Sequence, residues 1–130
     1  ISVYTWIEIV CLMINFTIYH NPRCSKSRQT LQLLKDNDIE PEIILYLEAP
    51  PDIETLSKII KLLSIKPRDL LRSSEVDYKT FNLKDTGISD LDIIKLMSLN
   101  PKLIERPIVL SDNKAIIGRP PENVLSLINE

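Results

Sequence analysis

The spacing of apolar residues along the chain predicts both strands and helices. Short runs rich in β-branched or aliphatic side chains are typical of strands, and they occur at residues 14–19, 42–46, 108–110 and 115–117. The last two runs are separated by Ser111-Asp112-Asn113, a turn sequence that predicts a hairpin. Because Ile43, Ile44 and Leu45 form an unbroken apolar run, we expect the second strand to be buried on both faces.

The segments between these strands carry apolar residues at the three- and four-residue spacing of helices. We expect helices after Cys24, from Ile53 to Leu63, from Pro67 to Arg72, after Ser89 and after Pro120, with a weakly specified polar helix over residues 73–79. Asp52 is the expected N-cap of the second helix, and Ser89 with Asp92 resembles a capping box. The order of elements is therefore β-α-β, a helical block, and then β-β-α.

This order indicates an α/β protein with a thioredoxin-like fold. In that fold a strand–helix–strand half and a hairpin–helix half share a mixed sheet, and here a helical insertion separates the halves. We expect residues 13–130 to form one such domain. Residues 1–12 are apolar and precede Met13, so we interpret them as an N-terminal extension that is non-native or flexible. The alternative is an extra strand or an arm that packs on the domain.

Composition and charge narrow the classes of function. The chain is 44% hydrophobic and 26% charged with a net charge of −2, so it has no overall attraction for nucleic acid or an anionic membrane surface. It has no run of about 18 uncharged apolar residues that could span a bilayer. One histidine and two cysteines are too few for a structural zinc site. Two cysteines do not form a disulfide framework, so we expect a cytoplasmic protein, and we expect it to be a monomer.

Cys24 is the strongest candidate for a reactive residue in this sequence. It follows a predicted strand and the turn at Asn21-Pro22, and it should stand at the start of a helix, where unpaired N–H groups and the helix dipole favour a thiolate. Arg23, Lys26 and Arg28 add positive charge, which is unlike the surroundings of a buried structural cysteine. We therefore predict a reactive thiol. Cys11, in the N-terminal extension, is expected to be inert.

The residues after Cys24 limit what this thiol can do. A Cys-x-x-Cys dithiol site needs a second cysteine at position 27, which is Ser27. A phosphatase loop of the Cys-x5-Arg type needs an arginine at position 30, which is Thr30. Any covalent intermediate on Cys24 must therefore be resolved by an outside thiol.

Three other side chains are candidates for the same site. His20 lies four residues before Cys24 and either tunes the thiol or is simply a turn residue at a strand end. Arg106 and Arg119 flank the predicted hairpin, and a guanidinium can bind a tetrahedral oxyanion through two parallel hydrogen bonds. If the edge of the hairpin faces the end of the first strand, both arginines can reach the space above Cys24. Otherwise they are solvated surface residues.

Four segments of the chain resemble the glutaredoxin-coupled arsenate reductase family. They are Ile-Tyr-His-Asn-Pro-Arg-Cys-Ser-Lys-Ser-Arg at 18–28, Asp-Leu-Leu-Arg at 69–72, Ile-Glu-Arg-Pro-Ile-Val at 104–109 and Ile-Gly-Arg-Pro-Pro-Glu at 117–122. They follow the family's order over residues 13–130, whereas residues 1–12 have no counterpart in the family pattern.

The resemblance implies a site and a reaction. Cys24 would be the nucleophile that forms a thiol–arsenate ester, assisted by His20, and Arg72, Arg106 and Arg119 would bind arsenate. It also implies a thioredoxin-like fold with a cis peptide before Pro107. Glutathione would be the co-substrate and glutaredoxin the partner that clears the mixed disulfide, with no bound metal or organic cofactor.

Two alternatives remain open at this point. The same fold and arginines could serve a related thiol oxidoreductase that acts on another anion or on glutathione itself. The chain could instead be a thiol-stress regulator of the Spx type that binds RNA polymerase. Such regulators commonly carry Cys-x-x-Cys at this position, and Ser27 argues against this second alternative.

Overall fold

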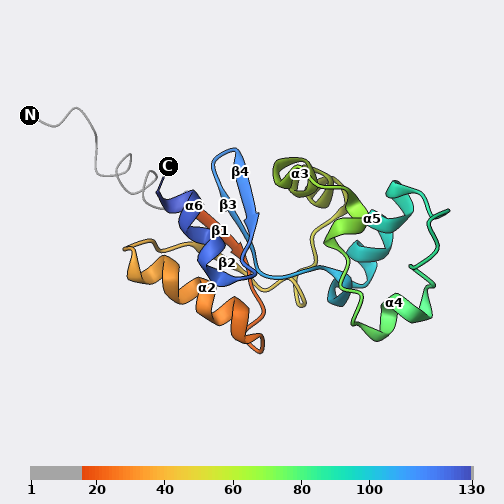
Figure 1. The fold of residues 1–130 in the computed structure, drawn as a ribbon, viewed down its shortest axis with the longest axis horizontal. Helices are drawn as coiled ribbons and strands as arrows, with labels where there is room; N and C mark the ends of the chain where they lie inside the picture. Colours follow the sequence, from red (N-terminus) through yellow and green to blue (C-terminus); the bar gives the residue numbers. More distant parts are fainter. Residues whose placement is uncertain (1–15, 130) are drawn as a thin grey trace, which may run out of the picture. The chain divides into compact units, whose positions relative to one another are not determined.

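A four-stranded mixed sheet is built from segments at both ends of the part of the chain that the computed structural model describes, residues 16–129 (Figure 1). The strands are β1 (Phe16–Tyr19), β2 (Glu42–Ile44), β3 (Ile108–Ser111) and β4 (Lys114–Ile117), in the order β2-β1-β3-β4. β1 pairs parallel with β2 and antiparallel with β3, and β3 pairs antiparallel with β4. This arrangement confirms the predicted α/β, thioredoxin-like fold. The predictions for residues 1–12 lie outside the described residues.

The chain divides into two compact units. Among the described residues, one unit contains the sheet and consists of residues 16–44 and 106–129, and the other consists of Leu45–Glu105. We call them the sheet unit and the helical unit. The helical unit corresponds to the insertion predicted between the two halves of the fold.

The second strand differs from its prediction. β2 ends at Ile44, and the next residues form a turn rather than continuing the strand to Tyr46. Among the described strands β2 pairs only with β1, and the side chain of Ile43 is 44% exposed. The prediction that this strand is buried on both faces was therefore wrong, because an unbroken apolar run can also lie at the edge of a sheet.

Helices at both ends of the sheet unit cover one face of the sheet. α2 (Ser25–Asp36) follows β1, whereas η3 (Pro121–Val124) and α6 (Leu125–Ile128) follow β4, and Figure 1 shows α2 and α6 on the same side of the strands. The predicted last helix is thus a 3-10 turn followed by one short α-helix. The buried core between these layers consists of Ile18, Leu34, Val109, Val124 and Leu127. This packing fixes the beginning of α2 relative to the end of β1.

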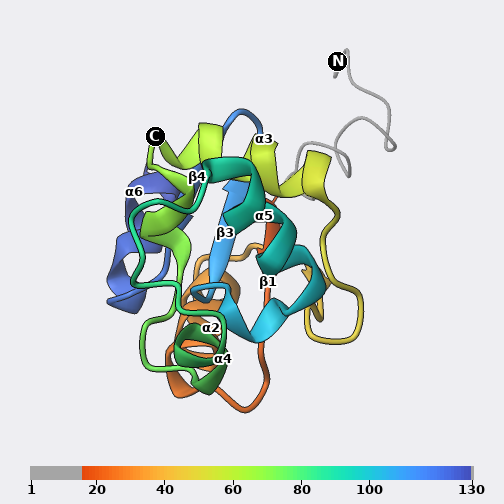
Figure 2. The same cartoon turned by 90° about the vertical axis from the view of Figure 1, so that its right-hand side faces the viewer.

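Buried apolar side chains of the helical unit include Leu56, Leu70, Leu83, Ile93 and Met97. The elements of this unit are α3 (Ile53–Leu63), η1 (Pro67–Leu70), α4 (Val76–Thr80), α5 (Asp90–Leu99) and η2 (Pro101–Leu103). Figure 2 shows the helices α3, α4 and α5 of this unit. The predicted caps are confirmed, because Asp52 accepts a hydrogen bond from the Thr55 N–H at 2.7 Å and Ser89 accepts one from the Asp92 N–H at 3.1 Å. The polar helix predicted over 73–79 begins later, at Val76. Within residues 16–129 no helix combines the length and apolarity needed to cross a membrane.

The loops around the hairpin carry two cis peptide bonds. The Arg106-Pro107 bond is cis, as the resemblance implied, and the Arg119-Pro120 bond is also cis, which was not predicted. The hairpin itself turns at Asp112, whose φ of 52° is in the left-handed region that aspartate tolerates better than most residues.

Candidate active site

Cys24 is the N-cap of α2, one position before the helix that the sequence predicts to follow it. Its N–H donates to the carbonyl of Asn21 at 3.0 Å, and its own carbonyl accepts the first helical hydrogen bond, from the Arg28 N–H at 3.0 Å. The loop is also closed by the Arg28 guanidinium, which donates to the carbonyl of Pro22 at 2.8 Å. The thiol is partly exposed. It is therefore held at the positive end of a twelve-residue helix while remaining accessible to a reactant.

The surroundings of this thiol favour its charged form. Partial burial raises the pKa of the Cys24 thiol, but several groups together outweigh that effect. In decreasing order they are the backbone N–H of Ser27, the side chain of Arg106 and the backbone N–H of Lys26, and the positive charge of Arg106 adds to them. The Cys24 side chain makes no N-cap hydrogen bond to the first turn of α2. The dipoles of the N–H groups in that turn still stabilise negative charge on the sulfur. The pKa of Cys24 lies below the ordinary thiol value, as expected for a reactive cysteine.

The structure brings two of the predicted arginines to this thiol. Nη1 of Arg119 lies 3.8 Å from Sγ of Cys24 and 3.4 Å from the carbonyl oxygen of Arg106. The side chain of Arg106 hydrogen-bonds to the same thiol. The two arginines meet there because the first residue of β3, Ile108, pairs with the last residue of β4, Ile117. The loop before β3 and the loop after β4 therefore lie at the same end of the hairpin.

His20 is placed close to Cys24 in sequence but is bonded elsewhere. Its Nδ1 lies 2.6 Å from Oγ of Ser27, and the same Oγ accepts a hydrogen bond from the N–H of Asn21 at 3.1 Å. Among the described residues no hydrogen bond joins the His20 ring to the Cys24 thiol. Burial lowers the pKa of His20, and the charges of Arg28 and Lys35 lower it further, so the ring is neutral near pH 7.

Ser27 connects these two residues. Its hydroxyl accepts from the N–H of Asn21 and lies within hydrogen-bonding distance of Nδ1 of His20, to which it donates when the ring proton is on Nε2. The backbone N–H of Ser27 lowers the pKa of the Cys24 thiol. The sequence singled out Ser27 only as a missing second cysteine. Its fully buried hydroxyl, at 0% exposure, makes it part of the site.

Arg72 lies in the helical unit, beyond η1. Its Nη1 donates to Oε1 of Glu105 at 2.7 Å, and its Nε lies 3.4 Å from Oε1 of Glu75. The side chain of Arg72 is 15% exposed and those of both glutamates are 25% exposed. Sequence reasoning identified the arginine but not these carboxylates. Glu105 stands next to Arg106 within a quoted motif, yet nothing in that motif indicates which arginine it pairs with.

A close contact fixes the loop that carries Arg119. A Cβ added at Gly118 would lie 2.5 Å from Oγ1 of Thr30 and 2.9 Å from Cγ of Pro107, well inside van der Waals distance. Oγ1 of Thr30, on α2, is 2.8 Å from the carbonyl of Lys26 and 3.3 Å from that of Gly118. The N–H of Gly118 donates to the carbonyl of Pro107 at 2.9 Å. Only a residue without a side chain lets the Arg119 loop approach α2 this closely.

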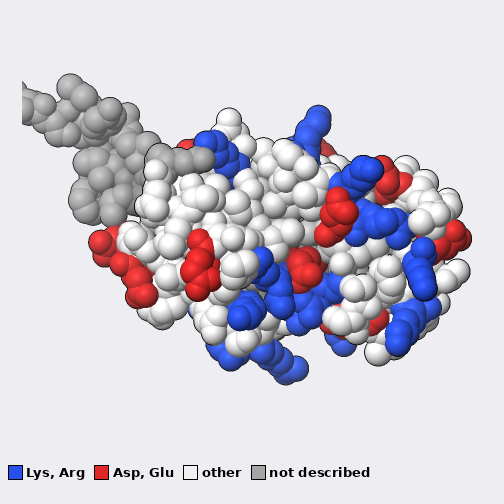
Figure 3. Space-filling view, in the orientation of Figure 1, with Lys and Arg blue, Asp and Glu red and all other residues white. Residues whose placement is uncertain are grey.

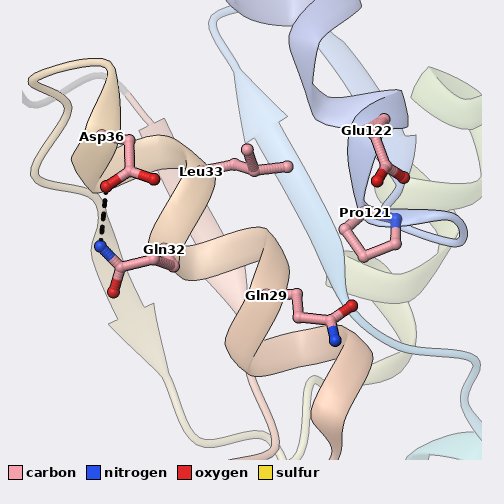
Figure 4. Close-up of a pocket in the computed structure, with 6 residues that line it drawn as sticks. All are labelled: Gln29, Gln32, Leu33, Asp36, Pro121 and Glu122. Atoms are coloured by element: carbon pink, nitrogen blue, oxygen red, sulfur yellow. Dashed lines mark hydrogen bonds between the residues drawn. The ribbon is translucent and has the colours of Figure 1, made fainter.

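Other parts of the described surface show no comparable grouping of reactive and charged side chains. Over the helical unit in Figure 3, lysine and arginine side chains are interspersed with acidic ones. A groove of about 260 Å³ lies between α2 and η3, lined by Gln29, Gln32, Leu33, Asp36, Pro121 and Glu122 (Figure 4). None of the predicted site residues lines this groove. Within residues 16–129 no cluster of three or more His, Cys, Asp or Glu side chains could hold a metal ion.

Comparison with known proteins places this site in a family context. A family model described as the ArsC family matches residues 19–127. The protein YfgD of Escherichia coli (strain K12), described as uncharacterised, is 54% identical over 112 residues, which cover 85% of this chain and 94% of that protein. An arsenate reductase of Haemophilus influenzae is 46% identical over 112 residues, which cover 85% of this chain and 97% of that protein.

A solved structure extends the comparison to three dimensions. An arsenate reductase from Vibrio cholerae superposes with a TM-score of 0.85 at 46% sequence identity, covering 87% of this chain and 97% of that one. The similarity therefore includes both the sheet unit and the helical unit. It spans nearly the whole length of each of these relatives.

Proposed function

This chain belongs to the ArsC family, and we propose that it reduces arsenate to arsenite with glutathione as co-substrate and glutaredoxin as partner. The observation that carries the proposal is the Cys24 thiol at the N-cap of α2, whose pKa is lowered and whose sulfur is contacted by Arg106 and Arg119. A thiolate between two guanidinium groups suits attack on a tetrahedral oxyanion. The relatives named arsenate reductase support arsenate as that oxyanion.

In the first proposed step the Cys24 thiolate attacks arsenic. A sulfur–arsenic bond forms and an arsenic–oxygen bond breaks, and the departing hydroxide takes up a proton and leaves as water. Arsenic remains As(V) in this thiol–arsenate ester. Arg106 and Arg119 stabilise the negative charge that develops on the oxygens, which is the usual contribution of fixed cations near a reacting oxyanion.

In the second step glutathione supplies the reducing thiol. Its attack on the adduct allows As(V) to accept two electrons and leave as arsenite, while the sulfurs of Cys24 and glutathione become a mixed disulfide. Glutaredoxin, with a further glutathione, then returns Cys24 to the thiol. The requirement for an outside thiol agrees with Ser27 in place of a resolving cysteine.

Two further residues have proposed roles in this cycle. We assign Arg72 to arsenate binding on the basis of the resemblance of residues 69–72 to the family motif. We assign His20 an indirect role, because its ring bonds to Ser27 and Ser27 in turn acts on Cys24. We also propose that the protein works in the cytoplasm, where glutathione keeps thiols reduced.

The experiment that tests the proposal measures arsenite formed from arsenate in the presence of glutathione, glutaredoxin, glutathione reductase and NADPH. Wild type should turn over arsenate, and Cys24→Ser should not. Omitting glutaredoxin should reduce the reaction to a single turnover. A wild-type protein with Cys24 reduced that forms no arsenite would overturn the proposed function.

A further inference from the structure

Arg72 is paired with two acidic side chains. Glu105 contacts its Nη1 at 2.7 Å and Glu75 approaches its Nε at 3.4 Å. One guanidinium thus stands between two carboxylates, so this cluster of three residues carries a formal charge of −1. A residue expected to attract an oxyanion is therefore set beside two carboxylates.

The backbone holds this pair in place. Leu71 and Ile104 form an isolated antiparallel bridge. On either side of it, the N–H of Arg72 donates to the carbonyl of Leu103 at 2.8 Å, and the N–H of Glu105 donates to the carbonyl of Leu70 at 2.8 Å. This register makes Arg72 and Glu105 diagonal neighbours on one face of the bridge, within reach of long side chains. The main chain at Arg72 and the main chain at Glu105 are therefore held together by backbone hydrogen bonds.

Partial burial strengthens the effect of the carboxylate. The side chains of Arg72 and Glu105 are 15% and 25% exposed, so solvent screens their charges less than it would at an open surface. An anion that contacts the remaining N–H groups of Arg72 must lie within a few ångströms of the Glu105 carboxylate. It is then attracted by one fixed charge and repelled by another.

We propose that Glu105 is a specificity-determining residue that makes the anion site at Arg72 favour oxyanions that retain a proton over fully ionised ones. The inference rests on the proposed function, because it takes Arg72 as an oxyanion-binding residue. Near neutral pH sulfate is a dianion without a proton. Phosphate and arsenate keep at least one proton, and part of each population carries a single charge.

The chemistry of the carboxylate discriminates between these two classes. An ionised carboxylate repels a dianion about twice as strongly as a monoanion at the same distance. It accepts hydrogen bonds and donates none, so a hydroxyl on phosphate or arsenate can turn toward it while sulfate has no proton to offer. Glutamine has the same shape without the charge and supplies an N–H donor. Glu105→Gln should therefore improve sulfate binding more than phosphate binding.

The test compares the affinities of the reduced full-length protein for inorganic phosphate and for sulfate, by calorimetry at pH 7 and low ionic strength. Neither anion is reduced, so the measurement does not depend on turnover. Wild type should prefer phosphate. Glu105→Gln should reduce the ratio of phosphate to sulfate affinity about fivefold or more, by tightening sulfate binding.

Three variants control this measurement. Glu54→Gln removes the same charge from an exposed ion pair with Lys58 in the same unit, and should leave the ratio unchanged. In an Arg72→Ala background the Glu105→Gln substitution should no longer change the ratio. If Glu105→Gln fails to fold, as judged by circular dichroism, Glu75→Gln should change the ratio in the same direction.

Several outcomes would overturn the inference. Equal loss of both affinities in Glu105→Gln would mean that the glutamate only holds Arg72 in place. An unchanged ratio, or no measurable binding of either anion by wild type and variant, would also reject it. The proposed function is judged separately by arsenite formation in the wild type, so failure of one claim can be recognised while the other stands.

Discussion

The pKa of the Cys24 thiol depends on opposing effects of its surroundings. Partial burial disfavours the thiolate, and the N–H groups of Ser27 and Lys26 together with Arg106 favour it. The net effect lowers the thiol pKa, and at a pH between the lowered and the ordinary value this increases the fraction of thiolate. At the scale of single residues the site is therefore an electrostatic balance that individual substitutions should shift.

Removing the Arg106 side chain should shift this balance most among the arginines. We expect Arg106→Ala to raise the pKa of Cys24, because the variant loses both a hydrogen bond to sulfur and a nearby positive charge. The measurement is the rate of alkylation by iodoacetamide as a function of pH, made in a Cys11→Ser background so that one thiol reacts.

At pH 7 the Arg106→Ala variant should react several-fold more slowly, with its rate profile displaced to higher pH. Arg23→Ala is the matched control, because Arg23 is adjacent in sequence but is not among the groups that act on the thiol. A profile that moves equally in both variants would contradict the assignment to Arg106.

His20 should titrate below the ordinary histidine value. It is the only histidine in the sequence, so its NMR signals can be assigned without ambiguity. Burial and the charges of Arg28 and Lys35 lower its pKa. We expect the Ser27 hydroxyl to donate to Nδ1 of His20, so that the ring proton is on Nε2. The titration of the imidazole 15N shifts reports both the midpoint and the tautomer. A midpoint above about 6.5, or a proton on Nδ1, would contradict this account.

The same shift has a consequence for stability. Because the folded state binds this proton less readily than the unfolded state, the contribution of His20 is complete above the unfolded pKa of about 6.5 and is lost as pH falls toward the folded pKa.

At the scale of elements, the site depends on how closely the loop after β4 approaches α2. Gly118 lies against Thr30 and Pro107, and the next residue is Arg119. Any side chain at this position must push the Arg119 loop away from the helix that carries Cys24. The contact joins residues that are 88 positions apart in the sequence.

Gly118→Ala should therefore impair the site and reduce stability. Overpacking of this kind typically costs about 1–3 kcal/mol, which denaturant unfolding can measure. We also expect kcat/KM for arsenate to fall roughly tenfold, a loss of about 1.4 kcal/mol of transition-state stabilisation, because the Arg119 guanidinium is displaced from the sulfur.

Gly87→Ala is the matched control for this prediction. A Cβ at Gly87 meets only the carboxylate of Asp85, at 3.2 Å, in an exposed loop of the helical unit. We expect little change in stability or activity. Equal effects of the two alanine substitutions would show that the close approach at Gly118 does not position Arg119.

The sequence predicted the positions of helices and strands better than it predicted strand pairing and burial. The positions of the hairpin, of α2 and of the capped helices α3 and α5 follow from local spacing and capping residues, and the structure confirms them. The edge position of β2 depends on which strands pair. The spacing of apolar residues within one strand does not indicate which other strands pair with it. The run at 42–46 correctly indicated a strand at Glu42–Ile44, but it gave the end of the strand and its burial wrongly.

At the scale of the whole molecule, the candidate site could be predicted only in part. Cys24 could be recognised from its position at a helix start, and Arg106 and Arg119 from their places beside the hairpin. The sequence could not reveal that His20 bonds to Ser27, or that Arg72 stands between two glutamates, because folding brings these side chains together from different local segments. Arg72 itself was identified through the resemblance rather than through any local pattern.

The division into two units also bears on function. Cys24, Arg106 and Arg119 belong to the sheet unit, and Arg72 with its glutamates belongs to the helical unit. Substitutions in the first group should act mainly on the thiol, and those at Glu105 mainly on the choice of anion. The alkylation profile and the anion affinities are therefore expected to respond to different variants.

The central claim is that Cys24 is the nucleophile of a glutathione-dependent reduction of arsenate. The most direct test is the mass of the Cys24 peptide after the reduced protein is incubated with arsenate and glutathione, without glutaredoxin. We predict a mixed disulfide between Cys24 and glutathione that forms only when both reagents are present, with one arsenite released per modified chain. Arsenite production with Cys24 left unmodified, or the same adduct formed without arsenate, would contradict it.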